Sequence, residues 1–469
     1  MARKPSLSPA TNPSSPTLWP HQQQTLKFLA KTPRAIDTSD PGTGKTVVHI
    51  LDFAQRPKAT RGRMLVVCPK TLMVPAWGED IVKFAPELTV AFAFAENRKS
   101  AFDTNADVVI INSDGVKWLD DKANVRVLTG FKQLVVDEFT TFKHPTSQRS
   151  KAMARLRKHF AVRRILSGTP NPNSVMELWL PAMIVDDGKR LGDSFFKLRG
   201  SVQNSVQKGP SPNHREWFDR PGAAQAVNEL LADITIRHAF EEVMTHVPAN
   251  HRDTKVFELS AKARKLYDKM ETDCILAFED KTINAVHAAA LRTKLLQISS
   301  GACYDGGEDS SYQLIDTTRY ELIADMVEDR AHSVVFFNWK HQRDLLQKEF
   351  ASRKMAFALI DGSVDQRKRD AIVADYQAGK YQTILLHPKT GAHGLTLTRG
   401  DTTVFSSPIY EADLMKQGIA RIYRGIQDKV TNTVFLEAKN TVEQAVYERL
   451  NGKYARMEDL LDMMKSRKK

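Results

Sequence analysis

The most informative eight residues of this chain read Ser39-Asp40-Pro41-Gly42-Thr43-Gly44-Lys45-Thr46. They follow a strand-like run at 34–38 and precede a helix-like run at 47–54. A glycine-bearing loop in that setting is typical of phosphate binding, because backbone N–H groups and a helix N-terminus both attract anions. Ser39 departs from the usual pattern, G-x-x-x-x-G-K-[ST], which begins with glycine.

The central residues of the loop have predicted roles. Gly42 and Gly44 let the backbone curl around phosphate oxygens, with Thr43 between them. Lys45 is expected to reach the outer phosphates of a nucleotide, and the Thr46 hydroxyl to ligate Mg²⁺. Taken alone, the stretch also fits a glycine-rich turn that binds nothing, so the rest of the chain has to decide.

Composition and charge limit the class of protein. The chain has 469 residues, of which 42% are hydrophobic and 26% charged, as in globular proteins of two or three domains. Its net charge of +13 favours a polyanionic partner such as nucleic acid, although a solubilising surface gives the same sum. No apolar run approaches the ~20 residues of a membrane span. Three scattered cysteines argue against disulfides and zinc, so a reducing cytoplasm is the expected location.

Short apolar runs alternate with helix-like stretches along both halves of the chain. Such alternation predicts parallel, doubly wound sheets whose functional loops lie at the carboxyl ends of the strands. The runs lie at 64–68, 108–111, 134–136 and 164–166, and again at 333–337, 357–360 and 383–386.

Asp137 and Glu138 come directly after the apolar run at 134–136. A carboxylate at the end of a strand can hold Mg²⁺, and its neighbour can orient the water that attacks a phosphate. An isolated Asp-Glu pair is usually a solvated turn. Together with the loop that ends in Lys45-Thr46, however, the pair predicts a site for phosphoryl transfer.

Three glutamines, Gln22, Gln23 and Gln24, precede the loop. A glutamine amide offers both a donor and an acceptor, and so can read the edge of adenine. A solvated surface glutamine is the ordinary alternative, and the residues alone do not choose among the three.

The middle of the chain has a weaker pattern. Aromatic and basic residues mix at 195–199 and 214–217, which fits either a nucleic-acid surface or a helical insertion with an aromatic core. The stretch 261–299 is helical in pattern, and 301–311 is a glycine- and acid-rich break in which we place the linker between domains. Candidate core positions of the helical stretch are Leu266, Tyr267, Met270, Leu291, Leu295 and Ile298.

The second half of the chain has no phosphate loop of its own. It carries a glycine-bearing stretch at 391–397 and, further on, Arg421 and Arg424. On a helix these two arginines would share a face, where two guanidiniums can grip phosphate oxygens. A solvated basic helix face is the alternative for this pair.

The motifs, in this order and at this spacing, resemble those of superfamily-two helicases and translocases of the DEAD/DEAH type, and within them the Swi/Snf-type ATPases. The resemblance covers about 18–453 and favours Gln22 among the three glutamines. The segments that carry it are Pro20-His21-Gln22 (the Q motif), Ser39–Thr46, Val67–Leu72 with Trp77 and Glu79 (the first nucleic-acid-contacting motif), Asp137-Glu138 with Phe142–Ser147 (motif II), Leu166–Pro170 with Glu177–Trp179 (motif III), Gly391–Leu397 (motif V) and Gln417–Gln427 (motif VI).

The resemblance implies an α/β fold with two RecA-like doubly wound parallel-sheet lobes and a helical insertion. It also implies an ATP hydrolase that binds ATP and Mg²⁺ between the lobes and moves along DNA, mostly duplex, through sequence-independent phosphate contacts. The implied segments are a flexible tail at 1–15, a first lobe at 16–240, a helical insertion at 241–300, a second lobe at 301–455 and a basic tail at 456–469.

The resemblance also assigns roles to individual residues. Those expected to act in hydrolysis are Lys45, Asp137, Glu138, Arg421 and Arg424. Those expected to bind the nucleotide are Gln22, Gly42, Thr43, Gly44, Lys45, Thr46 and Gly394, with Thr46 and Asp137 on Mg²⁺. Those expected near the nucleic acid are Lys70, Ser113, Thr169 and Thr396.

Two features bear on how far the resemblance extends. Motif II continues with Phe139-Thr140, where relatives carry a small residue and then His or Asp, which puts its coupling to neighbouring motifs in doubt. The chain shows no bromodomain-like, chromodomain-like or zinc-binding segment, and so resembles compact versions encoded by bacteriophages and mobile elements, which act in a prokaryotic cytosol. Two other functions stay open: an ATP-gated nucleic-acid clamp or scaffold with weak hydrolysis, and an RNA helicase.

Overall fold

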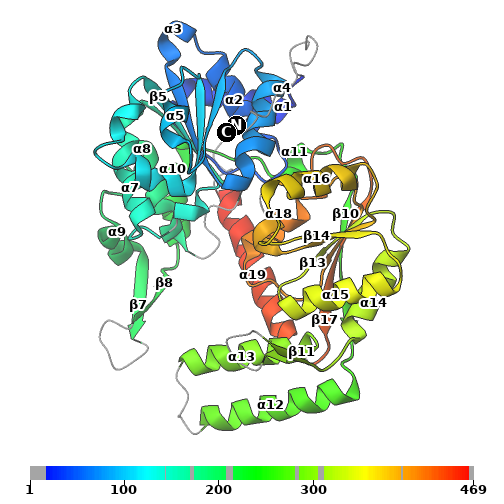
Figure 1. Cartoon of the computed structure of the whole chain (residues 1–469). Coiled ribbons are helices and arrows are strands. Elements are labelled where there is room, and N and C mark those ends of the chain that lie inside the picture. The colour runs from blue at the N-terminus through cyan, green and yellow to red at the C-terminus, as the bar shows by residue number, and fades with distance from the viewer. Residues whose placement is uncertain are drawn as a thin grey trace. The chain divides into compact units, whose positions relative to one another are not determined.

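The computed structural model describes residues 17–142, 144–168, 174–207, 215–279, 285–304, 311–391 and 394–463 (Figure 1). The chain forms two compact units. Lobe 1 consists of the residues up to Thr245 together with those from Ala455 onward, and lobe 2 is His246–Tyr454. Within the described ranges, no helix is both long enough and apolar enough to cross a membrane.

Lobe 1 is built on a seven-stranded sheet in which every pair of neighbouring strands is parallel. The order is β3-β4-β2-β5-β6-β1-β9, so the chain starts near one edge, crosses over and returns. The strands are β1 (Arg34–Asp37), β2 (Arg63–Cys68), β3 (Val90–Ala93), β4 (Val108–Asn112), β5 (Phe131–Asp137), β6 (Val162–Leu166) and β9 (Thr235–Ile236).

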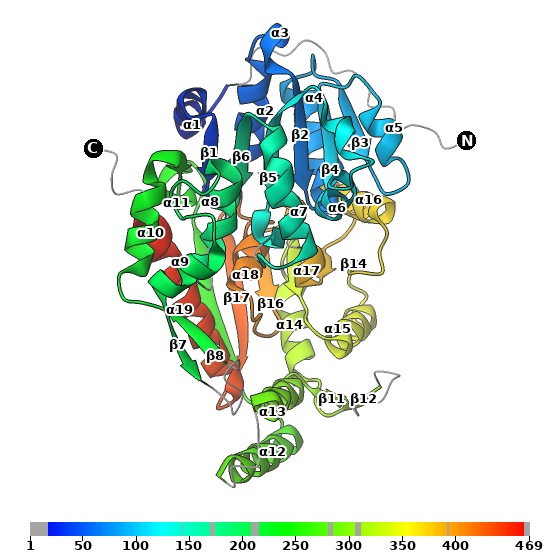
Figure 2. The ribbon, with the colours of Figure 1, turned by 90° about the vertical axis from the view of Figure 1, so that its left-hand side faces the viewer.

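Helices cover both faces of this sheet. The step from β1 to β2 and the step from β5 to β6 run in opposite directions along the sheet, and right-handed crossovers therefore place α2 and α7 on opposite faces (Figure 2). The helices of lobe 1 are α1 (Pro20–Lys31), α2 (Lys45–Ala54), α3 (Lys58–Arg61), α4 (Glu79–Phe84), α5 (Arg98–Phe102), α6 (Val116–Leu119), α7 (Gln148–Leu156), α8 (Trp179–Asp186), α9 (Phe195–Val202), α10 (Ala223–Leu231) and α11 (Phe240–Val243).

The aromatic and basic stretch of lobe 1 forms α9 and an antiparallel hairpin of β7 (Gln203–Gln207) and β8 (Arg215–Asp219) (Figure 1). The Arg199 guanidinium lies 4.0 Å from the centroid of the Trp217 ring and 5.1 Å from that of Phe196. Phe196 is 62% exposed, so these residues form a surface cation–π cluster rather than a closed aromatic core. A role of this cluster in nucleic-acid binding stays a prediction.

Lobe 2 is built on a six-stranded sheet with parallel pairing throughout, in the order β10-β17-β16-β13-β15-β14. Its central strands alternate between two hydrophobic clusters, with Val335 and Leu385 in one and Phe336 and Leu386 in the other. The strands are β10 (Asn250–Phe257), β13 (Ser333–Phe336), β14 (Phe357–Ile360), β15 (Thr383–Leu386), β16 (Thr402–Phe405) and β17 (Thr431–Ala438).

The helices of lobe 2 pack against these two clusters. Residues of α12, α13, α14 and α15 belong to the first cluster, and residues of α16, α18 and α19 to the second. Each lobe is therefore a doubly wound parallel sheet, as predicted. The helices are α12 (Ala261–Glu279), α13 (Ala285–Ser299), α14 (Thr318–Glu328), α15 (Lys340–Ser352), α16 (Gln366–Gln377), α17 (Pro388–Gly391), α18 (Ala412–Ile419) and α19 (Val442–Met463), which belongs to lobe 2 as far as Tyr454.

Lobe 2 begins earlier than the sequence predicts. Strand β10 lies inside the predicted helical insertion, yet it pairs with β17 along all eight of its residues. It is an edge strand and most of its residues are exposed, so it lacks the apolar run that marks an inner strand. The break at 301–311 is also not a linker between lobes, because β11 (Ala302–Tyr304) and β12 (Tyr312–Leu314) pair within lobe 2.

The predicted helical stretch is present as α12 and α13, which lie side by side and extend beyond the sheet of lobe 2 (Figures 1 and 2). Of the predicted core positions, Tyr267, Leu295 and Ile298 are buried, and Met270 and Leu291 pack partly against the same cluster. The prediction that Leu266 is a core residue is wrong, because Leu266 is 37% exposed. Successive helical residues point about 100° apart, so the inward position of Tyr267 turns its neighbour outward.

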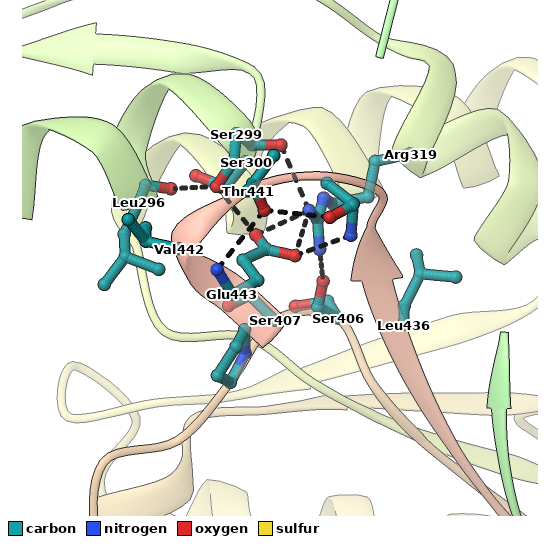
Figure 3. A network of polar contacts seen from close by, with 12 residues as sticks. Leu296, Ser299, Ser300, Arg319, Ser406, Ser407, Leu436, Thr441, Val442 and Glu443 are labelled. Carbon is teal, nitrogen blue, oxygen red and sulfur yellow. Dashed lines mark hydrogen bonds and ion pairs between the residues drawn. The ribbon is translucent and has the colours of Figure 1, made fainter. Parts of the chain in front are cut away.

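A buried ion pair joins three helices of lobe 2 (Figure 3). Arg319 of α14 donates to the two carboxylate oxygens of Glu443 of α19 at 2.7 and 2.9 Å. The Ser299 hydroxyl and the Ala438 N–H donate to the same carboxylate at 2.8 and 2.9 Å. Arg319 also donates to the Ser406 carbonyl at the end of β16. The pair thus fixes the start of α19 against the core of lobe 2.

Candidate functional site

The loop 39–46 lies at the carboxyl end of β1, and Asp137 is the last residue of β5. Only β6 separates these two parallel strands, so the loop and Asp137 lie at the same edge of the sheet of lobe 1. Crevices at the carboxyl edge of an open parallel sheet are where such folds bind ligands. The two predicted halves of the lobe 1 site are therefore brought together.

The loop has the backbone that phosphate binding requires. Gly42 and Gly44 have φ of 85° and 78°, in the left-handed region that favours glycine. Gly44 is also the residue before α2, and as a glycine it has no side chain with which to cap the first N–H groups of that helix. Those N–H groups carry the positive end of the helix dipole, which favours a bound anion.

Ser39 stands where the usual pattern has glycine, and its backbone and its hydroxyl both hold the loop. Its N–H donates to Asp37 Oδ1 at 2.9 Å, and its hydroxyl accepts from the His238 N–H at 3.1 Å. Its carbonyl accepts from Lys45 Nζ at 2.5 Å. The serine is buried and adopts no left-handed backbone, so the position has no need of glycine.

Lys45 bends back over the loop that precedes it. Its ammonium donates to the carbonyls of Ser39 and Asp40 at 2.5 and 3.0 Å. An ammonium has three N–H donors, so one donor of Lys45 has no partner among the described residues. This is the group expected to meet a phosphate oxygen.

A buried pair that the sequence did not predict supports the loop from below. Asp37 Oδ2 lies 3.2 Å from Nε2 of His49 on α2, and both side chains are 1% exposed. Burial alone would raise the pKa of Asp37, but the hydrogen bond and charge of His49, together with Lys45 and Ser39, outweigh it and lower that pKa to about 2. The carboxylate therefore stays ionised and can hold the Ser39 N–H.

A second buried pair anchors the middle of the loop. Arg237 donates to Asp40 Oδ1 at 2.9 Å and to the Thr38 carbonyl at 3.0 Å. The Phe240 N–H donates to Asp40 Oδ2 at 2.9 Å. The segment that follows β9 thus fixes the loop, although it lies about two hundred residues further along the chain.

In the acidic pair Asp137-Glu138, the backbone of Glu138 is unusual and the pKa of Asp137 is raised. Glu138 has a φ of 50°, which is rare for a residue other than glycine and is typical of strained functional sites. The carboxylate of Asp137 accepts from the Trp77 indole N–H and from the Glu138 N–H, both at 2.9 Å. Burial and the charge of Glu138 raise the pKa of Asp137 to about 6, against the effects of Trp77 and Lys45.

Gln22 lies directly against the loop. Its Oε1 accepts from the Trp19 N–H at 3.0 Å, and its Nε2 lies 3.4 Å from the Thr43 carbonyl oxygen. The space beside Gly44 is filled by the same amide, since a Cβ there would lie 2.3 Å from Gln22 Nε2. Gln22 is therefore part of the loop's support, and its reading of adenine stays a prediction.

The predicted nucleic-acid residues of lobe 1 fall in different places. Lys70 is exposed in the short helix η1 (Lys70–Leu72), directly after β2. Ser113 is buried in η3 (Ser113–Gly115) and lies 3.4 Å, oxygen to oxygen, from the hydroxyl of Thr141 in η5 (Phe139–Phe142). Thr169 lies outside the described residues. Its neighbour Gly168 touches the loop, because a Cβ there would lie 2.6 Å from the Pro41 ring.

The predicted residues of lobe 2 cluster around one loop. Arg421 and Arg424 both donate to the Leu395 carbonyl, at 3.0 and 3.4 Å, and Arg424 donates to the Thr396 hydroxyl at 2.6 Å. The prediction that these arginines share a helix face is wrong, since α18 ends at Ile419 and both lie in the turns that follow. The turns nevertheless bring the two guanidiniums together. Gly394, with a φ of 82°, begins the loop that they grip.

Two family models match most of this chain. A family model for the SNF2-related domain matches residues 21–301, and one for the helicase conserved C-terminal domain matches residues 316–425. Protein p41 of Acyrthosiphon pisum secondary endosymbiont phage 1 is 28% identical over 95% of this chain and 98% of its own length. The ATP-dependent helicase MG018 of Mycoplasma genitalium is 22% identical over 88% of this chain.

The relatives differ in how much of their length the chain spans. It spans nearly all of the phage protein but 39% of the Mycoplasma helicase. Among solved structures, the Sulfolobus solfataricus SWI2/SNF2 ATPase core in complex with dsDNA aligns over 97% of this chain and 94% of its own, at 18% identity and a TM-score of 0.44. The family assignment rests on the sequence matches.

Proposed function

The chain belongs to the SNF2-related family of helicase-type ATPases, and on this premise we propose that it hydrolyses ATP to ADP and phosphate and uses the energy to move along DNA. The observation that carries the proposal is the position of loop 39–46 and of Asp137-Glu138 at one edge of one parallel sheet. Lys45 is close enough to Asp137 for its charge to act on that carboxyl. This pairing of groups serves phosphoryl transfer.

The nucleotide fits lobe 1 on three counts. The left-handed backbone at Gly42 and Gly44 curls the loop, with Thr43 between them. The uncapped start of α2 offers N–H donors to an anion. Lys45 holds two carbonyls of the loop and keeps a third N–H to donate to a phosphate. ATP phosphates are therefore assigned to this loop.

We assign Mg²⁺ to Asp137 and the Thr46 hydroxyl. When bound with ATP, the ion supplies positive charge at the phosphates. Burial and the charge of Glu138 raise the pKa of Asp137 despite the charge of Lys45, so a further positive charge at this carboxyl would be favourable. The described residues contain no cluster of three or more potential metal ligands, and Mg²⁺ needs none, because phosphate and water oxygens complete its shell. Glu138 is left to orient the attacking water.

Lobe 2 is assigned the groups that act on developing charge. We propose that Arg421 and Arg424 stabilise the negative charge of the transferring phosphoryl group, and that Gly394 lets the adjoining loop approach the nucleotide. Both guanidiniums already bind oxygen, in the form of the Leu395 carbonyl. A phosphate oxygen is a stronger acceptor than a carbonyl, so an exchange of partners favours the phosphate.

Nucleic acid is the proposed activator. The net charge of +13 supports a polyanionic partner, and exposed Lys70 offers a phosphate contact at the start of η1. Ser113, Thr169 and Thr396 are proposed near the same strand. Duplex DNA is the preferred candidate, with phosphate contacts that do not depend on sequence.

We propose an origin among bacteriophages or mobile elements. The phage protein p41 matches this chain over almost the full length of both. We accordingly propose action in a prokaryotic cytosol.

Steady-state release of phosphate tests the proposal. We expect little turnover without nucleic acid, strong stimulation by duplex DNA and weaker stimulation by single-stranded DNA or RNA. Lys45→Ala should lower turnover by ~100-fold or more. Lys132→Ala is a matched control, because Lys132 also donates to a carbonyl of lobe 1, that of Thr60, but lies away from the loop.

The same measurement separates the alternatives. Unstimulated, very slow turnover with tight ATP-dependent DNA binding would identify a clamp, and preferential stimulation by RNA an RNA helicase. A strand-displacement substrate then tells unwinding from movement along an intact duplex.

A further inference from the structure

The segment between β2 and β3 connects a predicted nucleic-acid contact to the proposed Mg²⁺ ligand. It runs without a break through η1 (Lys70–Leu72), the π-helical turn η2 (Met73–Gly78) and α4. Lys70 is exposed at its start, whereas Trp77, seven residues on, is completely buried. One continuous helical stretch thus has its first residue at the surface and Trp77, near its middle, inside the site.

The wide turn has a local cause. Pro75 has no N–H, and its ring clashes with the preceding turn of an ordinary α-helix. The chain widens instead, and the Glu79 N–H reaches the Val74 carbonyl five residues back. Such π-helical turns are frequent at functional sites. The widening turns Trp77 toward β5, where its indole N–H donates to Asp137 at 2.9 Å.

Packing leaves the indole little freedom. Trp77 belongs to a hydrophobic cluster with Ile50 and Phe53 of α2 and with Val66 of β2. Gly78 is pressed against β3, since a Cβ there would lie 2.7 Å from the Phe92 ring. A displacement of the segment therefore changes the geometry of the bond to the carboxylate rather than being absorbed by a loose side chain.

We propose that Trp77 is a positioning residue that couples nucleic-acid binding at Lys70 to the orientation of Asp137, and through it to the affinity for Mg²⁺ and nucleotide. The inference rests on the proposed function. Motif II departs from the family pattern at Phe139-Thr140, which put its coupling to neighbouring motifs in doubt. Coupling through Trp77 does not depend on these two residues, because Trp77 acts on Asp137 directly. A hydrogen bond to an ionised acceptor is about twice as strong as one between neutral groups, so it can carry a coupling.

The connection from Ser113 to the segment that follows Glu138 is weaker than the connection through Trp77. Ser113, the other predicted contact of lobe 1, meets the segment after Glu138 only through Thr141, with 3.4 Å between two neutral hydroxyl oxygens. A separation this long makes a poor hydrogen bond. Trp77 is therefore the residue on which coupling within lobe 1 is expected to depend.

The test measures binding rather than turnover. The dissociation constant of a fluorescent, non-hydrolysable ATP analogue with Mg²⁺ is measured with and without a short DNA duplex, and the ratio of the two is the coupling factor. In the wild type we expect about fivefold or more. In Trp77→Phe, which removes the N–H donor, the factor should fall to within about twofold of one, while DNA affinity without nucleotide stays at the wild-type value.

Trp118→Phe is the matched control. Trp118 also lies in lobe 1, on α6, and packs against Phe102 with 5.8 Å between ring centroids, but it belongs to none of the motifs and the indole that donates to Asp137 is that of Trp77. This variant should keep the wild-type coupling factor. If Trp77→Phe does not fold, replacement of Trp77 by benzothienylalanine keeps the ring size and exchanges the N–H for sulfur.

The outcomes separate the inference from the proposed function. A wild type that does not hydrolyse ATP contradicts the proposed function. A wild type that hydrolyses ATP but shows no coupling, or a Trp77 variant that keeps the full coupling factor, overturns the inference alone. Loss of coupling in Trp77→Phe and the isostere, with Trp118→Phe unaffected, supports it.

Discussion

Arg319 and Glu443 form an ion pair with hydrogen bonds of 2.7 and 2.9 Å, and their side chains are only 2% and 0% exposed. Removal of one partner leaves the other charge buried and unpaired. We expect Glu443→Gln to lower the free energy of unfolding of lobe 2 by about 3–5 kcal/mol, and replacement of both residues by methionine to recover most of the loss. Denaturant unfolding of the full chain measures this.

A surface pair of lobe 2 provides the control for that experiment. Lys439 and Glu258 lie 2.8 Å apart, but their side chains are 52% and 76% exposed. Lys439→Ala should therefore change the free energy of unfolding by less than about 1 kcal/mol. Equal effects at the two pairs would contradict the importance of burial.

Asp137 is expected to serve hydrolysis at a cost in stability. Burial and the charge of Glu138 raise the pKa of its carboxyl from 3.8 to about 6. The folded protein therefore holds this proton more tightly than the unfolded chain, and its stability falls as pH rises between those values. Near neutral pH, Asp137→Asn should raise the free energy of unfolding by about 2 kcal/mol and abolish hydrolysis.

Thermal unfolding across the pH range checks this second prediction. The stabilising effect of Asp137→Asn should disappear below pH 3.8, where the wild-type carboxyl is protonated in both states. A stabilisation that is independent of pH would show that the charge of Asp137 is not its source.

The Asp37–His49 pair predicts the opposite dependence. His49, together with Lys45 and Ser39, holds the pKa of Asp37 at about 2, against the effect of burial, so the stability that this group contributes is complete above 3.8 and is lost as pH falls through about 2. Asp37→Asn takes the charged acceptor from the Ser39 N–H. Nucleotide affinity should drop about tenfold.

Fluorescence titration with an ATP analogue measures the effect at Asp37. Asp52→Asn is the control, because Asp52 is also buried, lies on α2 and pairs with Arg164 at 3.2 Å, but does not touch the loop. A similar loss of nucleotide affinity in both variants would point to α2 as a whole rather than to the loop.

Lys70 is predicted to contact a phosphate of the nucleic acid. Each phosphate contact that is lost should reduce the slope of log K against log salt by about one, so Lys70→Ala should have that effect on DNA binding. Lys83 lies on α4 in the same segment and is also exposed, and its replacement by alanine should leave the slope unchanged. Fluorescence anisotropy at several salt concentrations tells the two lysines apart.

Arg424 is predicted to act on the transition state rather than on binding. Arg424→Lys keeps the charge but loses the planar fork, so the rate of hydrolysis should fall ~100-fold or more while nucleotide affinity changes little. Single-turnover measurements separate the two quantities. Arg399→Lys in the same lobe is the control, since Arg399 binds His332 and the Gln377 carbonyl.

The inner strands and the loop were predictable from sequence because their patterns are local. Every apolar run that predicted a strand forms one, and the loop 39–46 lies where a strand passes into a helix. Strands β16 and β17 were not predicted, because threonines occupy their first positions and leave only short apolar runs, and β10 was not predicted because it is an exposed edge strand. Apolar continuity marks only strands that are buried on both faces.

The supports of the site were not predictable, because they join residues far apart in sequence. The sequence near Asp40 does not indicate that Arg237 will bind it. Aspartate and histidine are mostly found at the surface, so the sequence also does not indicate that Asp37 and His49 are buried together. The arginines of lobe 2 show the reverse case. Arg421 and Arg424 were predicted to lie together on one helix. They do lie together, but α18 ends at Ile419, before either of them.

The early start of lobe 2 decides how the protein can be dissected. A fragment that begins at residue 301 lacks β10 and leaves the unpaired N–H and carbonyl groups of β17 along its new edge. Such an edge recruits strands from other molecules, so this fragment should aggregate. A fragment that begins at His246 keeps β10 in place and should remain monomeric.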